Sequence, residues 1–408
     1  MADSPIRSDL RLAGITVVLG VASGGAAMLL TWILHGVEEV VYGRGEQHGQ
    51  VLVDGVSNWR MAAGVAVVSV VLAVAWWALR RRSELVGVRG MVDGKPAPVA
   101  GTLLNAVFQM IGVGAGLPVG REAAPRELAG LIAGRLSRGF DEDTRRLLVA
   151  ASAGAGLGAV YQVPVAGAVF AVELLLRQVS ARIVAVCLGI SAIATLVSRA
   201  SISPLPQYEA VHLDSTTPWL WLWALAVGAL LGPLGGWFGD VADRVKARSQ
   251  RGAWTLLTLS LTGLAVAATA WFLPLVLGNG RAAAQSAFLG MGLGAATIVL
   301  VGKLLVTFLT LRAGAVGGTL APAIAAGGLG GIIIGHLAAA VMPGVDVPVT
   351  ALAVLGAAAL LATSLRGPVT GLLLVAGVTG QGHEALLVMT LAVAAAFTTS
   401  MLRRPIPA

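Results

Sequence analysis

The chain is organised as a series of long apolar runs separated by short polar stretches. The apolar runs are rich in Leu, Val, Ile and Ala: 12–34, 62–79, 183–197, 219–237, 256–277, 295–311, 332–342, 351–362 and 385–401. A helix needs about 20 apolar residues to span a bilayer, and about 17 at the least. Several runs are long enough and others are too short, which predicts full spans together with partial or tilted helices. Partial helices are tolerated in a membrane only where the break faces protein or a water-filled cavity.

Two short breaks in this pattern resemble each other. Gly120-Arg121-Glu122-Ala123-Ala124-Pro125 lies between the apolar segments 112–119 and 128–136. Gly317-Gly318-Thr319-Leu320-Ala321-Pro322 opens a second apolar, glycine-rich run, and both breaks have the pattern Gly-x-x-x-Ala-Pro. We expect each to begin a helix within the membrane, where the N–H groups of the first turn can hold an anion.

A second pair of matches indicates an internal repeat. Pro164-Val165-Ala166-Gly167 corresponds to Pro368-Val369-Thr370-Gly371 at an offset of 204 residues, close to the offset of 197 between Gly120 and Gly317. Two matches at nearly one offset favour duplicated halves, and transporters commonly join inverted repeats of discontinuous helices at a midplane site. We therefore predict an all-α integral membrane protein with a single transmembrane domain over 1–408. Its halves cover about 10–205 and 215–403, joined by a connector at 201–217.

Composition supports the membrane assignment. The chain is 57% hydrophobic and 12% charged, whereas about 25% of the residues in a soluble domain are charged. The net charge of +8 is spread over short loops, mainly 80–95, 244–251 and 403–404. Such loops are topology signals and do not indicate nucleic-acid binding. We expect a multi-pass protein of the cell membrane with a cytoplasmic N-terminus and an external, acidic first loop from His35 to Asn58.

Glu122 is the first candidate for chemistry. A carboxylate within a membrane segment is costly and is usually functional. At a helix start it is stabilised by the dipole, and the same N–H groups can hold an anion instead. Glu122 and a permeating anion would then compete for one place, and protonation would release the side chain. The alternative is a helix cap paired with Arg121 or Arg126. Glu127, in the expected first helical turn, fits a dipole-stabilising residue better than a proton carrier.

Four further residues are each open to two interpretations. Thr319 and Leu320 present backbone N–H groups to an anion, or they mark a packing kink. Lys303 supplies positive potential near an anion path, or its side chain extends to the membrane interface. Glu173, near the end of a short apolar helix, relays protons, or it is a buried acid satisfied by backbone amides.

Other classes of function find no support in the sequence. The chain lacks Gly-x-Ser-x-Gly, His-Glu-x-x-His, Cys-x-x-Cys and a phosphate loop. Its five histidines are scattered, and its one cysteine, Cys187, lies in an apolar run. We expect a protein that is not an enzyme, with no cofactor, no metal and no nucleic-acid partner.

These motifs resemble those of the CLC family of chloride channels and chloride/proton antiporters. Gly120-Arg121-Glu122 is similar to that family's Gly-Lys/Arg-Glu-Gly-Pro motif, and 313–322 to its Gly-Gly-x-Phe-x-Pro region. The runs 151–173 and 356–374 also fit, so the resemblance covers about 80–402. It implies a homodimer of inverted-repeat subunits in membrane lipid, each with a pathway for chloride or another small anion.

The resemblance also implies roles for particular residues. It makes Glu122 the gating glutamate, which occupies an anion site and takes protons from outside, and Glu173 the nearest candidate for an inner proton site. The implied anion-binding residues are Gly120, Arg121, Ala123, Thr319 and Leu320, with Ser83 in the place of an anion-coordinating serine.

The sequence departs from the family pattern at several points. Arg82-Ser83-Glu84-Leu85-Val86 stands where the family has Gly-Ser-Gly-Ile-Pro, and Ala123-Ala124-Pro125 shifts the proline by one residue. Leu320 replaces a phenylalanine whose amide contacts the anion, and the family's internal proton-transfer glutamate falls at Leu174, next to Glu173. We also expect no counterpart of the family's final helix and its anion-coordinating tyrosine, and no paired regulatory domains.

Three hypotheses follow from these similarities and departures. The first is a proton-coupled anion antiporter, with chloride as the favoured ion and fluoride as a lesser option. The second is an uncoupled anion channel gated by Glu122, which the substitution at Leu174 favours. The third is a non-transporting membrane scaffold, suggested by the altered serine motif.

Overall fold

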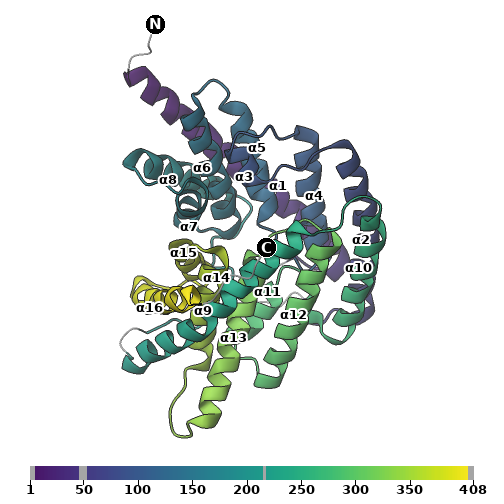
Figure 1. Ribbon diagram of the computed structural model, residues 1–408, viewed down its shortest axis with the longest axis vertical. Helices are drawn as coiled ribbons and strands as arrows, with labels where there is room; N and C mark the ends of the chain where they lie inside the picture. The colour runs from purple at the N-terminus through teal and green to yellow at the C-terminus, as the bar shows by residue number, and fades with distance from the viewer. Residues whose placement is uncertain (1–4, 46–52, 215–216, 403–408) are drawn as a thin grey trace. The chain divides into compact units, whose positions relative to one another are not determined.

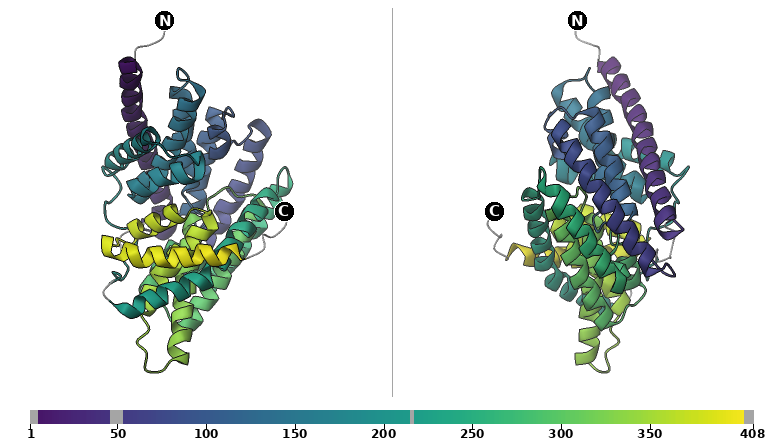
Figure 2. Two further views of the ribbon diagram at one scale, coloured as in Figure 1. Left: turned by 60° about the vertical axis from the view of Figure 1, so that its left-hand side comes forward. Right: turned by 90° about the vertical axis from the view of Figure 1, so that its right-hand side faces the viewer.

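The computed structural model describes residues 5–45, 53–214 and 217–402. Throughout these ranges the chain forms helices joined by short loops (Figures 1 and 2). In chain order the helices are α1 (Pro5–Tyr42), α2 (Asn58–Arg82), α3 (Val88–Val92), α4 (Val99–Gly114), α5 (Ala123–Leu136), α6 (Glu142–Tyr161), α7 (Pro164–Phe170), η1 (Ala171–Leu176), α8 (Ala181–Ser198), α9 (Pro218–Ala247), α10 (Trp254–Phe272), η2 (Pro274–Val276), α11 (Arg281–Phe288), α12 (Leu293–Ala313), α13 (Leu320–Val341), α14 (Val349–Leu365), α15 (Pro368–Val378) and α16 (His383–Met401). The all-α membrane fold predicted from the sequence is therefore confirmed.

The helix lengths agree with the predicted mixture of full and partial spans. Within the described ranges, eight helices are long and apolar enough to cross a membrane: α1, α2, α8, α9, α10, α12, α13 and α16. Four apolar segments are shorter, at 99–114, 164–176, 349–365 and 368–378. The apolar run 256–277 is divided, because α10 ends at Phe272 and Pro274 opens the short helix η2. A proline disfavours helical geometry in the residue before it.

The predicted external loop begins later than the sequence suggested. Helix α1 continues to Tyr42, so residues 35–42 are helical. Leu34, Val41 and Tyr42 are buried along this last part of the helix. Glu38 was assigned to the loop but is only 2% exposed, and it therefore does not contribute to an acidic loop surface. Burial of the apolar side chains favours continuation of the helix despite the polar residues between them.

The described chain forms two compact units. Unit 1 contains the described residues of 1–32, 82–107 and 122–204, and unit 2 those of 33–81, 108–121 and 205–408. The long helix α1 and the shorter α4 each contribute residues to both units. The two halves predicted from the sequence, joined at 201–217, are defined by repeated motifs, whereas these units are defined by contacts. The division into halves therefore stays a prediction.

Unit 1 is built on close approach between α5, α6, α7 and α8. A Cβ added to Gly156 would lie 2.5 Å from the carbonyl oxygen of Pro125, so α6 passes directly against the first turn of α5. A Cβ added to Gly154 would lie 2.2 Å from the carbonyl oxygen of Gly167 in α7. Small residues permit such backbone approach between helices in membranes. Gly156 in particular allows α6 to pack directly against the first turn of α5.

Unit 2 uses the same device between α13 and α14 and between α9 and α16. A Cβ at Gly331 would lie 2.0 Å from the carbonyl oxygen of Leu352, and one at Gly228 would lie 2.1 Å from that of Ala392. The connector residues from 205 onward also pack within this unit. The Tyr208 N–H donates to the Val378 carbonyl at 2.9 Å.

The repeated Pro-x-x-Gly segments have matching local structures. The C-cap residue after α6 is Gln162, with φ of 58°, and the C-cap residue after α14 is Arg366, with φ of 56°. In the first copy the Val163 N–H donates to the Gly158 carbonyl at 2.9 Å, and in the second the Gly367 N–H donates to the Ala362 carbonyl at 3.0 Å. Both are left-handed caps that satisfy carbonyls at a helix end. A proline then opens the next helix in each copy.

Candidate functional site

The loops that carry the two Gly-x-x-x-Ala-Pro motifs meet in unit 2. The Gly120 N–H donates to the Gly318 carbonyl, and the Gly318 N–H donates to the Gly120 carbonyl, each at 2.8 Å. The pair forms an isolated antiparallel bridge. It joins the loop before α5 to the loop before α13, so the two similar breaks belong to one local structure.

Glycine is required at this junction by space. A Cβ added to Gly317 would lie 2.5 Å from Val119 Cγ2 and 2.7 Å from Val119 Cβ. Real Cβ atoms do not approach other heavy atoms so closely, and both contact atoms lie near the backbone. Val119 is itself only 1% exposed and cannot rotate away into solvent. The glycine therefore allows the two loops to approach.

Helix α13 begins directly after the bridge. Thr319 is its N-cap residue, without a side-chain capping bond, and Leu320 opens the helix at 2% exposure. The N–H groups of a first helical turn have no partner within the helix, and Pro322 lacks one altogether. The Lys246 ammonium lies 3.5 Å from the Thr319 Oγ1. A first turn beside a lysine is an environment that favours negative charge.

Arg121 is held inside unit 2. It is 4% exposed, and its guanidinium donates to Gln207 Oε1 at 2.7 Å. The sequence did not identify Gln207, because it lies 86 residues away in a connector with no periodic pattern. The contact fixes Arg121 immediately beside the bridged Gly120.

The structure excludes one of the two interpretations of Lys303, the side chain that extends to the membrane interface. The side chain is 1% exposed, so it does not extend to the membrane interface. Its ammonium donates to the carbonyls of Val276 at 2.8 Å and Gly278 at 2.5 Å. The Gly278 N–H in turn donates to the Gly116 carbonyl at 2.8 Å, in the loop that leads to Gly120. Lys303 therefore places a buried ammonium behind the loop that supports the bridge.

Glu122 lies at the start of α5, in unit 1. It is fully buried, and its side chain makes no capping hydrogen bond to the helix. The Arg126 Nε donates to the Glu122 backbone carbonyl at 2.8 Å, and the guanidinium carbon lies 5.2 Å from the centre of the Phe170 ring. The carboxylate therefore does not cap the helix by a hydrogen bond, although the residue occupies the N-cap position; its pairing with Arg121 or Arg126 stays a prediction. Ala123 follows as the first residue of the helix.

The expected place of Glu127 is corrected by the structure. The residue lies beyond the first turn of α5, which contains no acidic side chain. Asn105 donates its side-chain amide to Glu127 Oε2 at 2.9 Å, and Glu127 is 9% exposed. The helix begins at Ala123, earlier than a first-turn position of Glu127 requires, and the Glu127 carboxylate accepts a hydrogen bond from helix α4 instead of stabilising the helix start.

Ser83 lies in the short link between α2 and α3, also in unit 1. Its Oγ is buried and has no hydrogen-bond partner among the described residues. A Cβ added to Gly101 would lie 2.1 Å from this oxygen, so the hydroxyl lies against the backbone of α4. A buried hydroxyl without a partner is costly, and the anion-binding role that the resemblance implies for Ser83 stays a prediction.

Glu173 lies in the π-helical segment η1, which continues α7. In an α-helix neighbouring side chains are about 100° apart. A π-helix has more residues per turn, so Glu173 and Leu174 are closer in direction than expected. Short π segments inside helices occur frequently at functional sites. Arg89 donates to the Leu174 carbonyl at 3.4 Å and thereby contacts this segment.

The sequence-derived site residues thus fall into two groups. Unit 2 holds Gly120, Arg121, Thr319 and Leu320 around the bridge, and unit 1 holds Ser83, Glu122, Ala123 and Glu173. Among the residues that the structure describes, no group of three or more His, Cys, Asp or Glu side chains could hold a metal ion.

Comparison with known proteins gives consistent results. The family model described as "Voltage gated chloride channel" matches residues 66–401. The chain is 28% identical over 315 residues to the H⁺/Cl⁻ exchange transporter ClcA of Vibrio cholerae serotype O1, covering 72% of this chain and 66% of that protein. It is 26% identical over 373 residues to a putative chloride channel protein, ClcB-like, of Ralstonia nicotianae, covering 84% and 87%.

Two solved structures share the fold. A slow cyanobacterial Cl⁻/H⁺ antiporter has a TM-score of 0.79 at 20% identity, covering 96% of this chain and 94% of that one. A CLC-type fluoride/proton antiporter has a TM-score of 0.76 at 18% identity, covering 98% and 97%. Together with the family match over most of its length, these likenesses show that the chain belongs to the voltage-gated chloride channel (CLC) family of membrane transport proteins.

Proposed function

We propose that this protein exchanges a small anion, with chloride as the favoured ion, for protons across the membrane, and that Glu122 is the coupling residue. The observation that carries the proposal is the complete burial of Glu122 at the start of α5. An ionised carboxylate there must be stabilised by helix N–H groups or by the dipole. Protonation removes that requirement and frees the N–H groups for an anion.

The bridged loops supply the complementary support. Gly120 and Gly318 hold the start of α13 beside the residue that precedes Arg121 and Glu122 in the chain. The α13 start carries no carboxylate, and Lys303 and Lys246 bring positive charge to this unit. Thr319 and Leu320 are therefore suited to hold an anion through their backbone. Ser83 Oγ is proposed separately as an anion ligand of unit 1.

Proton movement on the inner side is assigned to Glu173. The π-helical geometry of η1 brings its direction closer to that of Leu174 than an α-helix would. A specific observation favours the second candidate function, an uncoupled channel: the position that matches the family's internal glutamate is leucine. The two candidates share the anion path and differ in whether protons move.

The test is anion efflux from sealed vesicles with external pH recorded at the same time, for the wild type and Glu122→Gln. Antiport predicts that protons enter the vesicles as anions leave them in the wild type. In Glu122→Gln it predicts that only the proton signal is lost and anion efflux continues. Anion efflux without protons in both proteins would establish the channel. No movement of chloride or fluoride in either protein, over several pH values, would overturn the transport proposal and favour a scaffold.

The inner proton site is tested with Glu173→Gln and a matched change at a second acid. Coupling through Glu173 predicts that Glu173→Gln abolishes proton movement while anion efflux continues. Glu84→Gln, in the link that contains Ser83, removes an exposed acid of the same unit and should leave the proton-to-anion ratio unchanged. An unchanged ratio in Glu173→Gln would contradict the assignment.

A further inference from the structure

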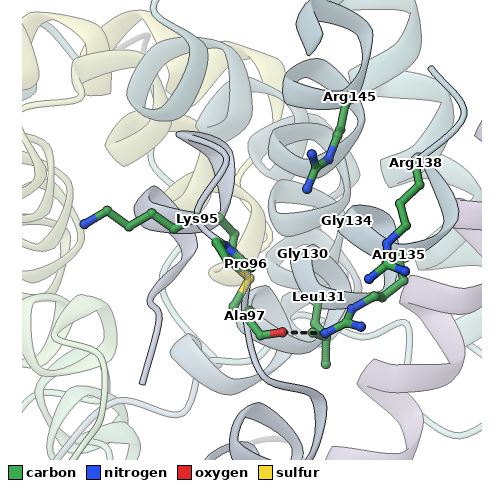
Figure 3. Close-up of a pocket in the computed structure, with 10 residues that line it drawn as sticks. Lys95, Pro96, Ala97, Gly130, Leu131, Gly134, Arg135, Arg138 and Arg145 are labelled. Carbon is green, nitrogen blue, oxygen red and sulfur yellow. Dashed lines mark hydrogen bonds between the residues drawn. The ribbon is translucent and has the colours of Figure 1, made fainter. Parts of the chain in front are cut away.

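Unit 1 contains a cavity of about 50 Å³ away from the residues discussed above. Figure 3 shows its lining, which comes from the end of α3, the loop after it, the second half of α5, the loop between α5 and α6, and the start of α6. The residues are Met91, Lys95, Pro96, Ala97, Gly130, Leu131, Gly134, Arg135, Arg138 and Arg145. A single water molecule needs about 10–15 Å³ of such space, so the cavity has room for a group of a few heavy atoms.

The charge around this cavity has one sign. Of its described lining residues, Lys95, Arg135, Arg138 and Arg145 are basic and none is acidic. Within the described part of the chain, no carboxylate forms an ion pair with any of these four side chains. The guanidinium groups of Arg135, Arg138 and Arg145 lie near one another beside the cavity, whereas the Lys95 side chain extends away from them (Figure 3). The three like charges repel each other, and an anion between them would relieve that repulsion.

The floor of the cavity is open because of two glycines. A Cβ added to Gly134 would meet only Val149 Cγ2, at 3.9 Å, and one added to Gly130 would meet its nearest atom, Met91 Sδ, at 3.4 Å. These are ordinary contacts, so close helix packing does not require glycine at either position. Their missing side chains instead leave space among the arginines.

One of the arginines is already fixed in place. The Arg135 guanidinium donates to the Ala97 carbonyl at 2.7 Å, as the dashed line in Figure 3 shows. This bond holds Arg135 to the loop before α4 and lowers the entropy that binding would cost. Basic residues that report topology lie in loops, as Arg138 does here, but Arg135 belongs to α5 and Arg145 to α6, and all three line the same cavity.

A larger hollow adjoins the cavity and shares Met91, Arg138 and Arg145 with it. Its volume is about 570 Å³, and it is also lined by Phe140, Arg146 and two carboxylates, Asp93 and Glu142. A ligand with an anionic group in the small cavity can therefore extend into a mixed polar and aromatic space. A phosphate attached to a larger polar body fits this shape.

We propose that the cavity between α3, α5 and α6 binds the phosphate group of an anionic ligand, either a lipid headgroup or a free phosphate compound. Arg138 and Arg145 are its main charge partners, and Arg135 is the preorganised one. Arginine suits the role because its planar fork matches phosphate oxygens in pairs. Basic pockets beside membrane helices are recognised sites for anionic headgroups.

The experiment uses the purified full-length protein and separates the two sources. In one arm, native mass spectrometry counts bound cardiolipin or phosphatidylglycerol, with phosphatidylcholine as the neutral lipid. In the other, equilibrium dialysis measures binding of radiolabelled inorganic phosphate and pyrophosphate. Saturable binding in the lipid arm identifies a headgroup, and saturable binding in the dialysis arm alone identifies a free phosphate compound.

Variants decide whether that binding occurs in the cavity. A basic residue near an anionic surface contributes about fivefold to affinity, so Arg138→Gln with Arg145→Gln should weaken binding roughly 25-fold. The control, Arg248→Gln with Arg251→Gln, removes two exposed charges from the loop after α9 and should have no effect. Gly134→Leu keeps every charge, fills the cavity and should abolish binding.

Three results would overturn the proposal. One is the absence of saturable binding of any probe to the wild type. The second is an equal loss in both double variants, because binding would then follow total charge and not this cavity. The third is wild-type affinity in Gly134→Leu, which tests the site even if the arginine variants fold poorly.

Discussion

The reciprocal bond between Gly120 and Gly318 can be broken by one methyl group. In Gly317→Ala the new Cβ would lie 2.5 Å from Val119 Cγ2 and 2.7 Å from Val119 Cβ. Because the second atom is attached directly to the backbone, a change of rotamer cannot relieve both contacts. One of the two loops has to move. Each loop carries one glycine of the Gly120–Gly318 pair, so either movement disturbs the two hydrogen bonds between them.

The expected cost follows from two contributions. Overpacking of a well-packed interior costs about 1–3 kcal/mol. Loss of the two backbone hydrogen bonds adds about 1 kcal/mol each, so we expect Gly317→Ala to lower the free energy of unfolding by about 3–5 kcal/mol. Displacement of the α13 start should also reduce anion flux more than tenfold, because Thr319 and Leu320 would move with it.

Reversible unfolding by sodium dodecyl sulfate in mixed micelles measures the free energy, and vesicle efflux measures the flux. The control is Gly294→Ala in the first turn of α12, where a Cβ would meet no described atom within 4 Å outside its own helix. Alanine favours a helix over glycine by up to about 1 kcal/mol, so the control should be neutral or slightly stabilising.

A second substitution tests the steric explanation. Val119→Gly removes both atoms that the new methyl group would touch, so the double variant should recover part of the stability lost in Gly317→Ala. We expect a favourable coupling of at least about 1 kcal/mol. Wild-type stability and flux in Gly317→Ala, or strictly additive effects in the double variant, would refute the reasoning.

Three other predictions concern single side chains. Lys303→Met should reduce anion flux at least tenfold, as measured by vesicle efflux. It should change the free energy of unfolding in micelles by less than about 2 kcal/mol, because removal of the buried ammonium also removes the cost of its desolvation. Ser83→Ala should weaken anion binding in calorimetry without loss of stability, since its Oγ has no partner among the described residues. Asp141→Ala should cost about 0.5–2 kcal/mol of stability, because Asp141 Oδ1 accepts the Thr144 N–H at 2.9 Å as the cap of α6. The same bond lowers the pKa of Asp141, so the contribution is present above the unfolded-state pKa of about 4 and is lost as pH falls through the lower folded-state value. Unfolding at pH 7 and at pH 3 measures that difference.

Each of these predictions has a result that contradicts it. Flux retained in Lys303→Met, with Arg248→Met as the surface control, would show that the ammonium is only a packing element. Unchanged anion affinity in Ser83→Ala would remove the serine from the site. A stability difference between wild type and Asp141→Ala that persists unchanged at pH 3 would show that the charge of the cap is irrelevant.

The sequence was sufficient to predict the long apolar helices, because apolar length alone decides whether a segment can span a membrane. It did not predict the short helices α3 and α11. It also matched the segments at Pro164 and Pro368 to each other, and in both a proline opens a helix just after a left-handed residue. It failed at Tyr42, since continuation of α1 depends on burial of Val41 and Tyr42 by residues distant in the chain.

The sequence named candidate site residues, whose roles stay predictions, but it did not predict how those residues are connected. The two glycine motifs could be matched by similarity, yet nothing in either predicts that Gly120 binds Gly318. Lys303 was left between two interpretations because burial of a lysine depends on carbonyls of the loop 276–278. The π-helical turn at Glu173 has no signal in hydropathy, which does not distinguish it from α-helix.

The Gly120–Gly318 bridge also sets an order of events during synthesis. Its partners are separated by 198 residues, and chains grow at roughly 5–20 residues per second. The loop at Gly120 therefore waits about 10–40 s for its partner, after the preceding helices have already entered the membrane. During that interval its backbone groups must be satisfied by water or by the insertion machinery, so correct maturation depends on keeping the early loop accessible until the later one arrives.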